Sequence, residues 1–292
     1  MNTTNHANEF IIGIIAPTGI DKHTIVSKID FGCRRFSYKT IHIKVSRDII
    51  PLFSGIHEFT SEFDRIRSSM DTGNFVREKT KDNSFLMKAV INSIYNARLN
   101  NQKEGNDNPL SSEKNIYIID SIKNPDEVAL LRSVYGTGFH LLGISSSKIK
   151  RIEQLKSRTM SESDARSLIE RDEDEENQHG QKTRDAFQEC DYFIDADSNA
   201  DEVKHDIDRL LHLLFGDPFI TPTFDEYAMF IAYSASLRSA DLSRQIGAVI
   251  AKNNEIISMG ANDCPKAFGG LYWPKEIILA ELPMKLVVEI IR

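Results

Sequence analysis

The sequence predicts an α/β protein, with a three-layer parallel sheet in its first part and a smaller α/β domain after it. Short apolar runs that suit buried strands alternate with segments whose apolar residues recur at helical spacing. Gly216, Asp217 and Pro218 then end a helical pattern and begin a polar connection. We therefore predict two domains, spanning residues 9–216 and 222–292.

The composition is that of a globular protein, since 40% of the 292 residues are hydrophobic. A net charge of −7 argues against binding of duplex nucleic acid, whereas a single nucleotide needs only a local cationic pocket. The three cysteines lack the spacing of a disulfide framework or a zinc knuckle. The start of the chain lacks a signal peptide pattern, and no apolar run reaches the ~18 residues that span a bilayer. We expect a soluble protein of the cytoplasm, with no membrane partner.

The segment Phe10–Lys28 predicts a strand, a tight turn and a helix, and it contains the first candidate site. Isoleucines at positions 11, 12, 14 and 15 suit a strand buried on both faces, and Asp21 can cap the helix. The N–H groups of such a turn and the positive end of the helix dipole favour an anion. A purely structural turn is the alternative. We predict binding of nucleotide phosphates, or of a nucleoside triphosphate, by Thr18, Gly19, Asp21 and Lys22.

This turn departs from the full phosphate-loop pattern G-x-x-x-x-G-K-[ST]. Lys22 is in register, but Asp21 stands where the pattern has glycine and His23 stands where it has serine or threonine. The hydroxyl that holds magnesium is therefore missing, unless Thr24 replaces it. We expect neither tightly held Mg²⁺ nor ATP hydrolysis at this turn.

In the rest of the first domain, predicted strands alternate with predicted helices, and one of these strands ends at Asp120. Because ligands of doubly wound sheets gather at the carboxyl ends of the strands, we expect Asp120 to face the same crevice as Gly19. Asp120 orients a metal ion or a substrate hydroxyl there, or it is an ordinary cap or turn residue. Strands are predicted at 41–45, 115–120, 139–144 and 192–195, and helices at 53–70, 85–99, 125–135 and 201–215, with a break at 71–74 and a surface loop at 100–113.

Residues 148–184 are rich in charge, with several arginines beside an acidic run at 171–176. A run of charges is usually a solvated helix face. The phosphate-loop-like turn suggests a second interpretation, in which arginines on a mobile lid, Arg158 among them, close over a triphosphate. Both interpretations stay open at the level of the sequence.

The second domain begins with a capping pattern at Thr223–Glu226 before a predicted helix at 227–237. A strand hairpin is predicted at 245–251 and 256–260. Polar residues after the helix and after the hairpin would share one rim of this small sheet. Such groups hold a sugar and a phosphate, or serve as ordinary turn residues. The residues of interest are Arg238, Ser239 and Asn262.

The segments Ser236–Ile250 and Gly260–Pro265 resemble the opening of a deoxycytidylate-type deaminase domain. With the phosphate-loop-like first domain, residues 9–273 resemble the bacterial anti-phage dCTP deaminases, which join a P-loop, nucleotide-kinase-like domain to a cytidine-deaminase-like zinc domain. Further matching pieces lie at 16–21, 70–77, 119–127, 183–187 and 269–273. The resemblance implies zinc as cofactor and a deoxycytidine nucleotide (dCTP or dCMP) as ligand. It also implies depletion of the deoxycytidine nucleotide pool during phage infection. It also implies that Arg238, Ser239 and Asn262 help to hold the nucleotide.

The zinc chemistry of that family requires H-x-E and P-C-x-x-C motifs, and this sequence has neither. We therefore predict no metal ligands and no catalytic residues, and expect a truncated or frameshifted deaminase whose second domain is incomplete. One alternative is a short natural form that acts as a nucleotide-binding sensor or regulatory protein. Another is a nucleotide kinase, which Asp21 and His23 weaken. Whether the chain is an enzyme, which nucleotide it binds and whether it forms a homo-oligomer stay open.

Overall fold

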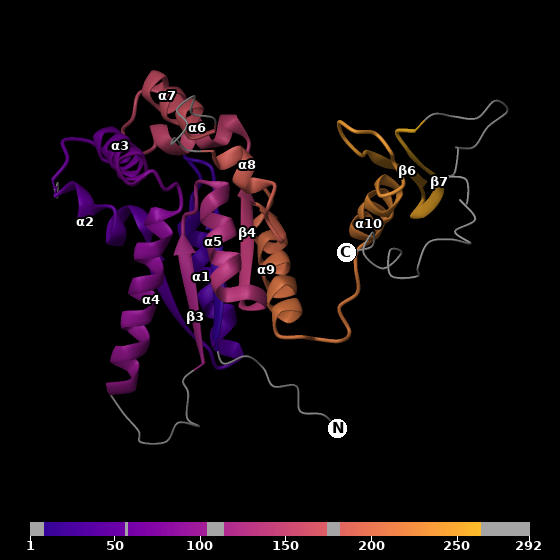
Figure 1. The fold of residues 1–292 in the computed structure, drawn as a ribbon, viewed down its shortest axis with the longest axis horizontal. Coiled ribbons are helices and arrows are strands. Elements are labelled where there is room, and N and C mark those ends of the chain that lie inside the picture. The colour runs from indigo at the N-terminus through magenta and orange to yellow at the C-terminus, as the bar shows by residue number, and fades with distance from the viewer. Residues whose placement is uncertain (1–8, 56–57, 104–113, 174–181, 264–292) are drawn as a thin grey trace, which may run out of the picture. The chain divides into compact units, whose positions relative to one another are not determined.

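The computed structural model describes residues 9–55, 58–103, 114–173 and 182–263, and the chain divides into two compact units after Asp217 (Figure 1). The larger unit contains the candidate phosphate loop, and the smaller one contains the hairpin with its preceding helix. Among the described helices, none is both long enough and apolar enough to cross a membrane.

The described part of the first unit is built around a five-stranded parallel sheet, which confirms the predicted α/β class. The strands are β1 (Glu9–Ile15), β2 (Lys39–Lys44), β3 (Asn115–Asp120), β4 (Phe139–Ser145) and β5 (Tyr192–Asp195). They lie in the order β2-β3-β1-β4-β5, so that β1 is central. The register pairs Ile14 of β1 with Asp120 of β3, which brings the carboxyl ends of these two strands side by side.

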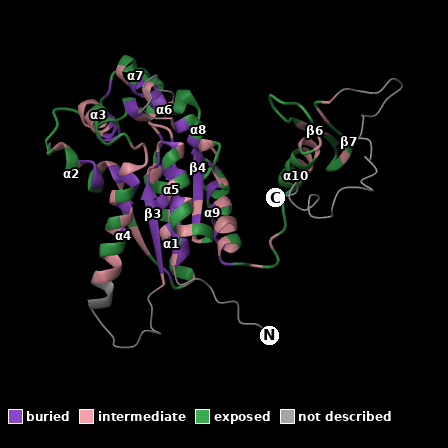
Figure 2. Ribbon diagram, in the orientation of Figure 1, coloured by how far each residue is buried: buried purple, intermediate pink, exposed green. Residues whose placement is uncertain are grey.

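Helices cover both faces of this sheet, as the prediction of three layers requires. Odd and even positions of β1 point to opposite faces, so Ile12 and Ile14 pack against one layer while Ile11 and Ile15 pack against the other. Figure 2 shows the resulting buried strands between the helices. One layer consists of α1 (Lys22–Arg35) and α9 (Ala200–Leu214), and the other contains α4 (Phe85–Lys103), α5 (Pro125–Tyr135) and α8 (Thr183–Phe187).

A further apolar cluster lies at the end toward which the strands run (Figure 1). There α3 (Glu62–Thr80) packs against α6 (Lys148–Lys156) and α7 (Glu162–Glu173). Met70 of α3 and Leu155 of α6 are among its buried residues. Within the segment that the sequence suggested as a lid, residues 148–173 thus form two helices that pack on α3 through apolar contacts. The short elements η1 (Val45–Ile49), α2 (Pro51–Ser54) and η2 (Gly136–Gly138) complete the unit.

The predicted helix at 53–70 began too early, and the predicted break at 71–74 was wrong. The chain ends α2 at Ser54, and α3 then runs without interruption from Glu62 to Thr80. The glycine and asparagine at 73 and 74 suggest a turn by composition, but Asn74 is buried and its side chain accepts a hydrogen bond from Arg77 at 3.4 Å. Tertiary packing here overrides weak local propensity. The predicted surface loop also began too early, because α4 continues to Lys103, and residues 104–113 lie outside the described part.

The described part of the second unit consists of α10 (Phe224–Ser236) and the antiparallel pair β6 (Gly247–Lys252) and β7 (Glu255–Ala261). The predicted capping pattern is confirmed, since the side chains of Thr223 and Glu226 cap each other's backbone and α10 begins three residues before its predicted start. Asn253 and Asn254 both have positive φ, which suits the tight turn between the strands.

Candidate functional site

A cleft of about 550 Å³ lies at the carboxyl ends of β1, β2 and β3, and α3 and the end of α6 also line it. The helices that follow β1 and β3 lie on opposite faces of the sheet, and such a switch point opens a crevice where ligands bind. Among the described residues, its lining holds more cations than carboxylates although the whole chain is acidic. The charged residues are Lys22, Arg34, Lys44, Arg65, Arg77, Lys123 and Arg158, against Asp21, Asp30, Asp120, Glu127 and Asp172.

The loop between β1 and α1 has the backbone of an anion-binding turn. Gly19 has a φ of +98°, a conformation that side chains disfavour. A Cβ at this position would lie 2.8 Å from the carbonyl oxygen of Arg151. Asp21 caps α1, since its side chain accepts a hydrogen bond from the backbone N–H of His23 at 3.1 Å. The structure therefore gives Asp21 a capping contact and leaves the cationic contribution of this turn to Lys22.

Lys22 and Asp120 meet in the cleft as an ion pair. Asp120 is almost fully buried, and Nε2 of His42 lies 3.7 Å from its second carboxylate oxygen. Burial acts to raise the pKa of Asp120, but Lys22 and His42 outweigh burial and hold that pKa well below its usual range. Asp120 is therefore an ionised acceptor at neutral pH. Asp120 thus lines the same cleft as Gly19 and Lys22, as the sequence predicted, and His42 is a neighbour that the sequence did not indicate.

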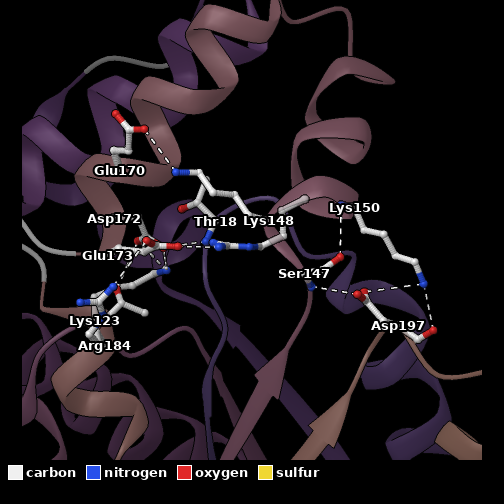
Figure 3. A network of polar contacts seen from close by, with 12 residues as sticks. Thr18, Lys123, Ser147, Lys148, Lys150, Glu170, Asp172, Glu173, Arg184 and Asp197 are labelled. Atoms are coloured by element: carbon white, nitrogen blue, oxygen red, sulfur yellow. Dashed lines mark hydrogen bonds and ion pairs between the residues drawn. The ribbon is translucent and has the colours of Figure 1, made fainter.

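A buried polar network supports the loop from the side of α7 (Figure 3). The carboxylate of Asp172, which has no exposed surface, accepts a hydrogen bond from the backbone N–H of Thr18 at 2.6 Å. Nζ of Lys123 lies 2.8 Å from the other oxygen of Asp172 and donates to the carbonyl of Ala16 at 2.8 Å. Burial lowers the pKa of Lys123, and the Asp172 carboxylate opposes that shift. Thr183 of α8 also donates to Asp172, at 3.3 Å.

Of the arginines that the sequence placed on a lid, Arg158 lines the cleft in the structure. It lies 3.5 Å from Glu62 of α3, which also pairs with Arg65 at 2.6 Å. Arg151 is buried against Gly19 and pairs with Glu173 at 2.5 Å. The remaining arginines of the segment form ion pairs away from the cleft lining: Arg166 with Glu162, Arg171 with Asp71 and Arg184 with Glu173.

Arg77 and Glu127 form a buried ion pair at the wall of the cleft, with 2.8 Å between Nη2 and Oε1. Both side chains are at most 2% exposed. The second oxygen of Glu127 accepts a hydrogen bond from the backbone N–H of Lys123 at 2.8 Å, which ties α3 and α5 to the strand end that carries Asp120. Both residues lie in segments that the family resemblance covers, 70–77 and 119–127, but no local pattern indicates that positions 50 residues apart form a pair.

In the second unit, two of the three predicted nucleotide contacts bond to each other. The hydroxyl of Ser239 donates to the carbonyl of Asn262 at 3.0 Å. The side-chain amide of Asn262 in turn donates to the carbonyl of Arg244 and accepts from the N–H of Ile246, both at 2.7 Å. Arg238 is half-buried just beyond α10. In this structure the side-chain amide of Asn262 serves to join the segment before β6 to the end of β7.

Within the described residues, no group of three or more His, Cys, Asp or Glu side chains is placed to hold a metal ion. Burial raises the pKa of both Cys33 and Cys190 to about 12, so these thiols stay protonated at neutral pH. Cys264 lies outside the described residues. Zinc therefore fits no site that the structure describes.

No protein family model matches this chain, and no curated protein matches it. Among solved structures, several kinases match this chain at low TM-score. A gluconokinase from Sinorhizobium meliloti 1021 has a TM-score of 0.37 at 13% identity, covering 73% of this chain and 96% of the gluconokinase. A shikimate kinase from Bacteroides thetaiotaomicron has a TM-score of 0.36 at 10% identity, covering 70% and 98%. A deoxyadenosine kinase from M. mycoides has a TM-score of 0.34 at 11% identity, covering 70% and 100%. These scores are too low to support a function.

Proposed function

We propose that the unit ending at Asp217 binds a nucleotide through its phosphates, in the cleft at the carboxyl ends of β1 and β3. The observation that carries this proposal is the loop at Thr18–Lys22. It combines a glycine at φ +98°, the start of α1 and a lysine that lines a cleft in which cations outnumber carboxylates. A helix start and the N–H groups of a tight turn favour an anion by partial positive charge. Phosphate is the anion that nucleotides present to such a turn.

Binding is better supported than phosphoryl transfer. A kinase needs a group that orients or deprotonates the acceptor hydroxyl, and Asp120 is the carboxylate at the right strand end. Its depressed pKa makes it a weak general base at neutral pH, and Lys22 already pairs with it. Hydrolysis of an amino group has less support, because the described residues offer no set of zinc ligands. Of the classes that the sequence left open, we propose a nucleotide-binding sensor or regulatory protein.

For the identity of the nucleotide we propose dCTP. The support is the sequence resemblance of Ser236–Ile250 and Gly260–Pro265 to deoxycytidylate-type deaminases. These two segments lie in the second unit, whereas the cleft is in the first unit, where the matching pieces at 16–21, 70–77 and 119–127 contribute to its lining. The phosphate contacts of the loop do not distinguish one base from another. Comparison of dCTP with dTTP, ATP and GTP tests the choice of base separately from the choice of phosphate.

The experiment is isothermal calorimetry on the full chain with dCTP and the other three triphosphates. Lys22→Ala should weaken binding at least tenfold, which corresponds to about 1.4 kcal/mol. Lys28→Ala is the matched control, since Lys28 lies on the same helix but its Nζ bonds to the carbonyl of Ala200 outside the cleft. Its affinity should equal that of the parent. Absence of triphosphate binding by both the folded parent and the folded Asp172→Asn variant at millimolar concentration would reject the proposed function.

A further inference from the structure

One backbone donor of the loop, the N–H of Thr18, already has a hydrogen-bond partner. The backbone N–H of Thr18 donates to Asp172 of α7 at 2.6 Å, across 154 positions of sequence. The same carboxylate oxygen accepts a hydrogen bond from Nζ of Lys123 at 3.1 Å, and the other oxygen of Asp172 lies 2.8 Å from that nitrogen. An anionic oxygen between a loop N–H and a lysine has the environment of a bound phosphate oxygen. The carboxylate of Asp172 therefore makes the contacts that a phosphate oxygen of the proposed ligand would make in this loop.

The helix before α7 closes the same loop from outside. A Cβ at Gly19 would lie 2.8 Å from the carbonyl oxygen of Arg151 and 2.9 Å from its Cβ, so α6 packs directly on the turn. Arg151 is buried, and its Nε and Nη1 have no hydrogen-bond partner among the described residues. Buried donors without partners are costly, and an incoming anion would satisfy them. Helix α6 thus covers the loop, and the Asp172 carboxylate bonds to its Thr18 N–H.

We propose that Asp172 is an internal latch: its carboxylate occupies the anion position of the Thr18–Lys22 loop, and α6 and α7 must shift before a phosphate binds there. This proposal rests on the proposed function and adds a mechanism that regulates phosphate binding. A triphosphate has more negative charge than a single carboxylate and can displace it, leaving Lys123 and Arg151 as cationic partners. The apolar cluster that joins α3, α6 and α7 holds the latch closed in the absence of ligand.

Asp172→Asn tests the latch, because it keeps the shape of the side chain and removes its charge. Calorimetry with inorganic triphosphate should show affinity at least tenfold above that of the parent. Thr183→Val removes one hydrogen bond to Asp172 without touching the loop, and it should raise affinity about threefold. Glu170→Gln is the control on the same helix, since Glu170 is exposed and pairs with Lys148. Its affinity should match the parent.

A gain in affinity could also follow from the loss of any negative charge near the cleft, so a second measurement uses the parent alone. Hydrogen exchange with and without inorganic triphosphate should show faster exchange in Glu162–Glu173 when the ligand is bound, and slower exchange in the loop. Slower exchange in both segments would mean that α7 stays in place, and the latch would then be rejected.

The outcomes separate the latch from the proposed function. If the parent binds triphosphate and folded Asp172→Asn binds no more tightly, the latch is wrong and the proposed function stands. If Asp172→Asn does not fold, as thermal unfolding would reveal, Thr183→Val decides, and an unchanged affinity for that variant overturns the latch. If neither the parent nor any folded variant binds, both proposals fail. Binding by Asp172→Asn but not by the parent would support both.

Discussion

At the scale of single residues, the loop after β1 depends on Gly19 for two separate reasons. Its φ of +98° is a backbone conformation that residues with a Cβ rarely adopt, and the space that a Cβ would take is occupied by backbone atoms of Arg151. Backbone cannot move aside as a flexible side-chain end can. The same residue therefore controls the shape of the turn and the packing of α6.

Gly19→Ala should lower the free energy of unfolding by about 1–3 kcal/mol, because it combines an unfavourable φ with a contact at 2.8 Å. Urea unfolding of the full chain measures this loss. Gly138→Ala is the control, since the atom nearest to its added Cβ is 4.0 Å away. That variant should stay within ~0.5 kcal/mol of the parent. Equal stability of the two variants would show that the turn adapts to a side chain.

Arg77 and Glu127 illustrate a different principle, that of a buried charge which needs its partner. Both are almost fully buried, and the distance between them is 2.8 Å. Arg77→Met leaves Glu127 as an unpaired charge in the interior, and we expect the free energy of unfolding to fall by about 3–5 kcal/mol. The double variant Arg77→Met with Glu127→Leu should recover much of that loss. Failure of the second change to restore stability would show that the pair is not the main interaction.

The depressed pKa of Asp120 predicts that the free energy of unfolding decreases at low pH. The pKa of an unfolded aspartate is ~3.9, and the pKa of Asp120 in the folded state is lower, so the unfolded state binds more protons in this range. The contribution is therefore complete above about pH 5 and is lost as the pH falls toward the folded pKa. The difference in free energy of unfolding between parent and Asp120→Asn should shrink from pH 5 to pH 2. A constant difference would contradict the ion pair with Lys22.

At the scale of elements, the sequence predicts the sheet well and the cleft only in part. Strands rich in isoleucine and helices with one apolar face have strong periodicity, and β3, α5 and β5 begin and end where predicted. Thr18, Gly19, Lys22 and Asp120 lie around one cleft because parallel strands end at the same edge. The roles of Asp172, Lys123 and Arg151 come from contacts between distant segments, which no local pattern encodes. Asp172 lies within an acidic run that composition alone marks as a solvated surface.

The packing of α6 provides a test at this scale, since two isoleucines of the helix differ only in exposure. Ile152 is 6% exposed and belongs to the cluster with α3, whereas Ile149 is 70% exposed. Ile152→Ala should reduce the free energy of unfolding by about 2–4 kcal/mol, and Ile149→Ala should change it by less than ~0.5 kcal/mol. Urea unfolding compares the two. Similar losses at both positions would mean that α6 is not anchored by this cluster.

At the scale of the whole molecule, the two units differ in how much apolar surface they bury. In the first unit, each face of the sheet carries its own cluster of buried apolar residues. In the second, α10 contains no buried residue within the described part of the chain, and large apolar side chains on it and on the hairpin are exposed. These exposed residues include Met229, Phe230, Tyr233, Ile250 and Met259. Burial of apolar surface supplies most of the driving force for folding, so the two units should differ in their ability to fold alone.

We therefore expect a fragment of residues 1–217 to fold alone and to unfold cooperatively, with a midpoint within a few degrees of the parent. A fragment of residues 218–292 should show no cooperative thermal transition by circular dichroism, because the elements described in it bury too little apolar surface to offset the entropy of ordering the chain. Limited proteolysis of the parent should cut first between Asp217 and Thr223, where the two units are joined. Resistance to cleavage there, together with one transition that the 1–217 fragment fails to reproduce, would show that the units fold as one.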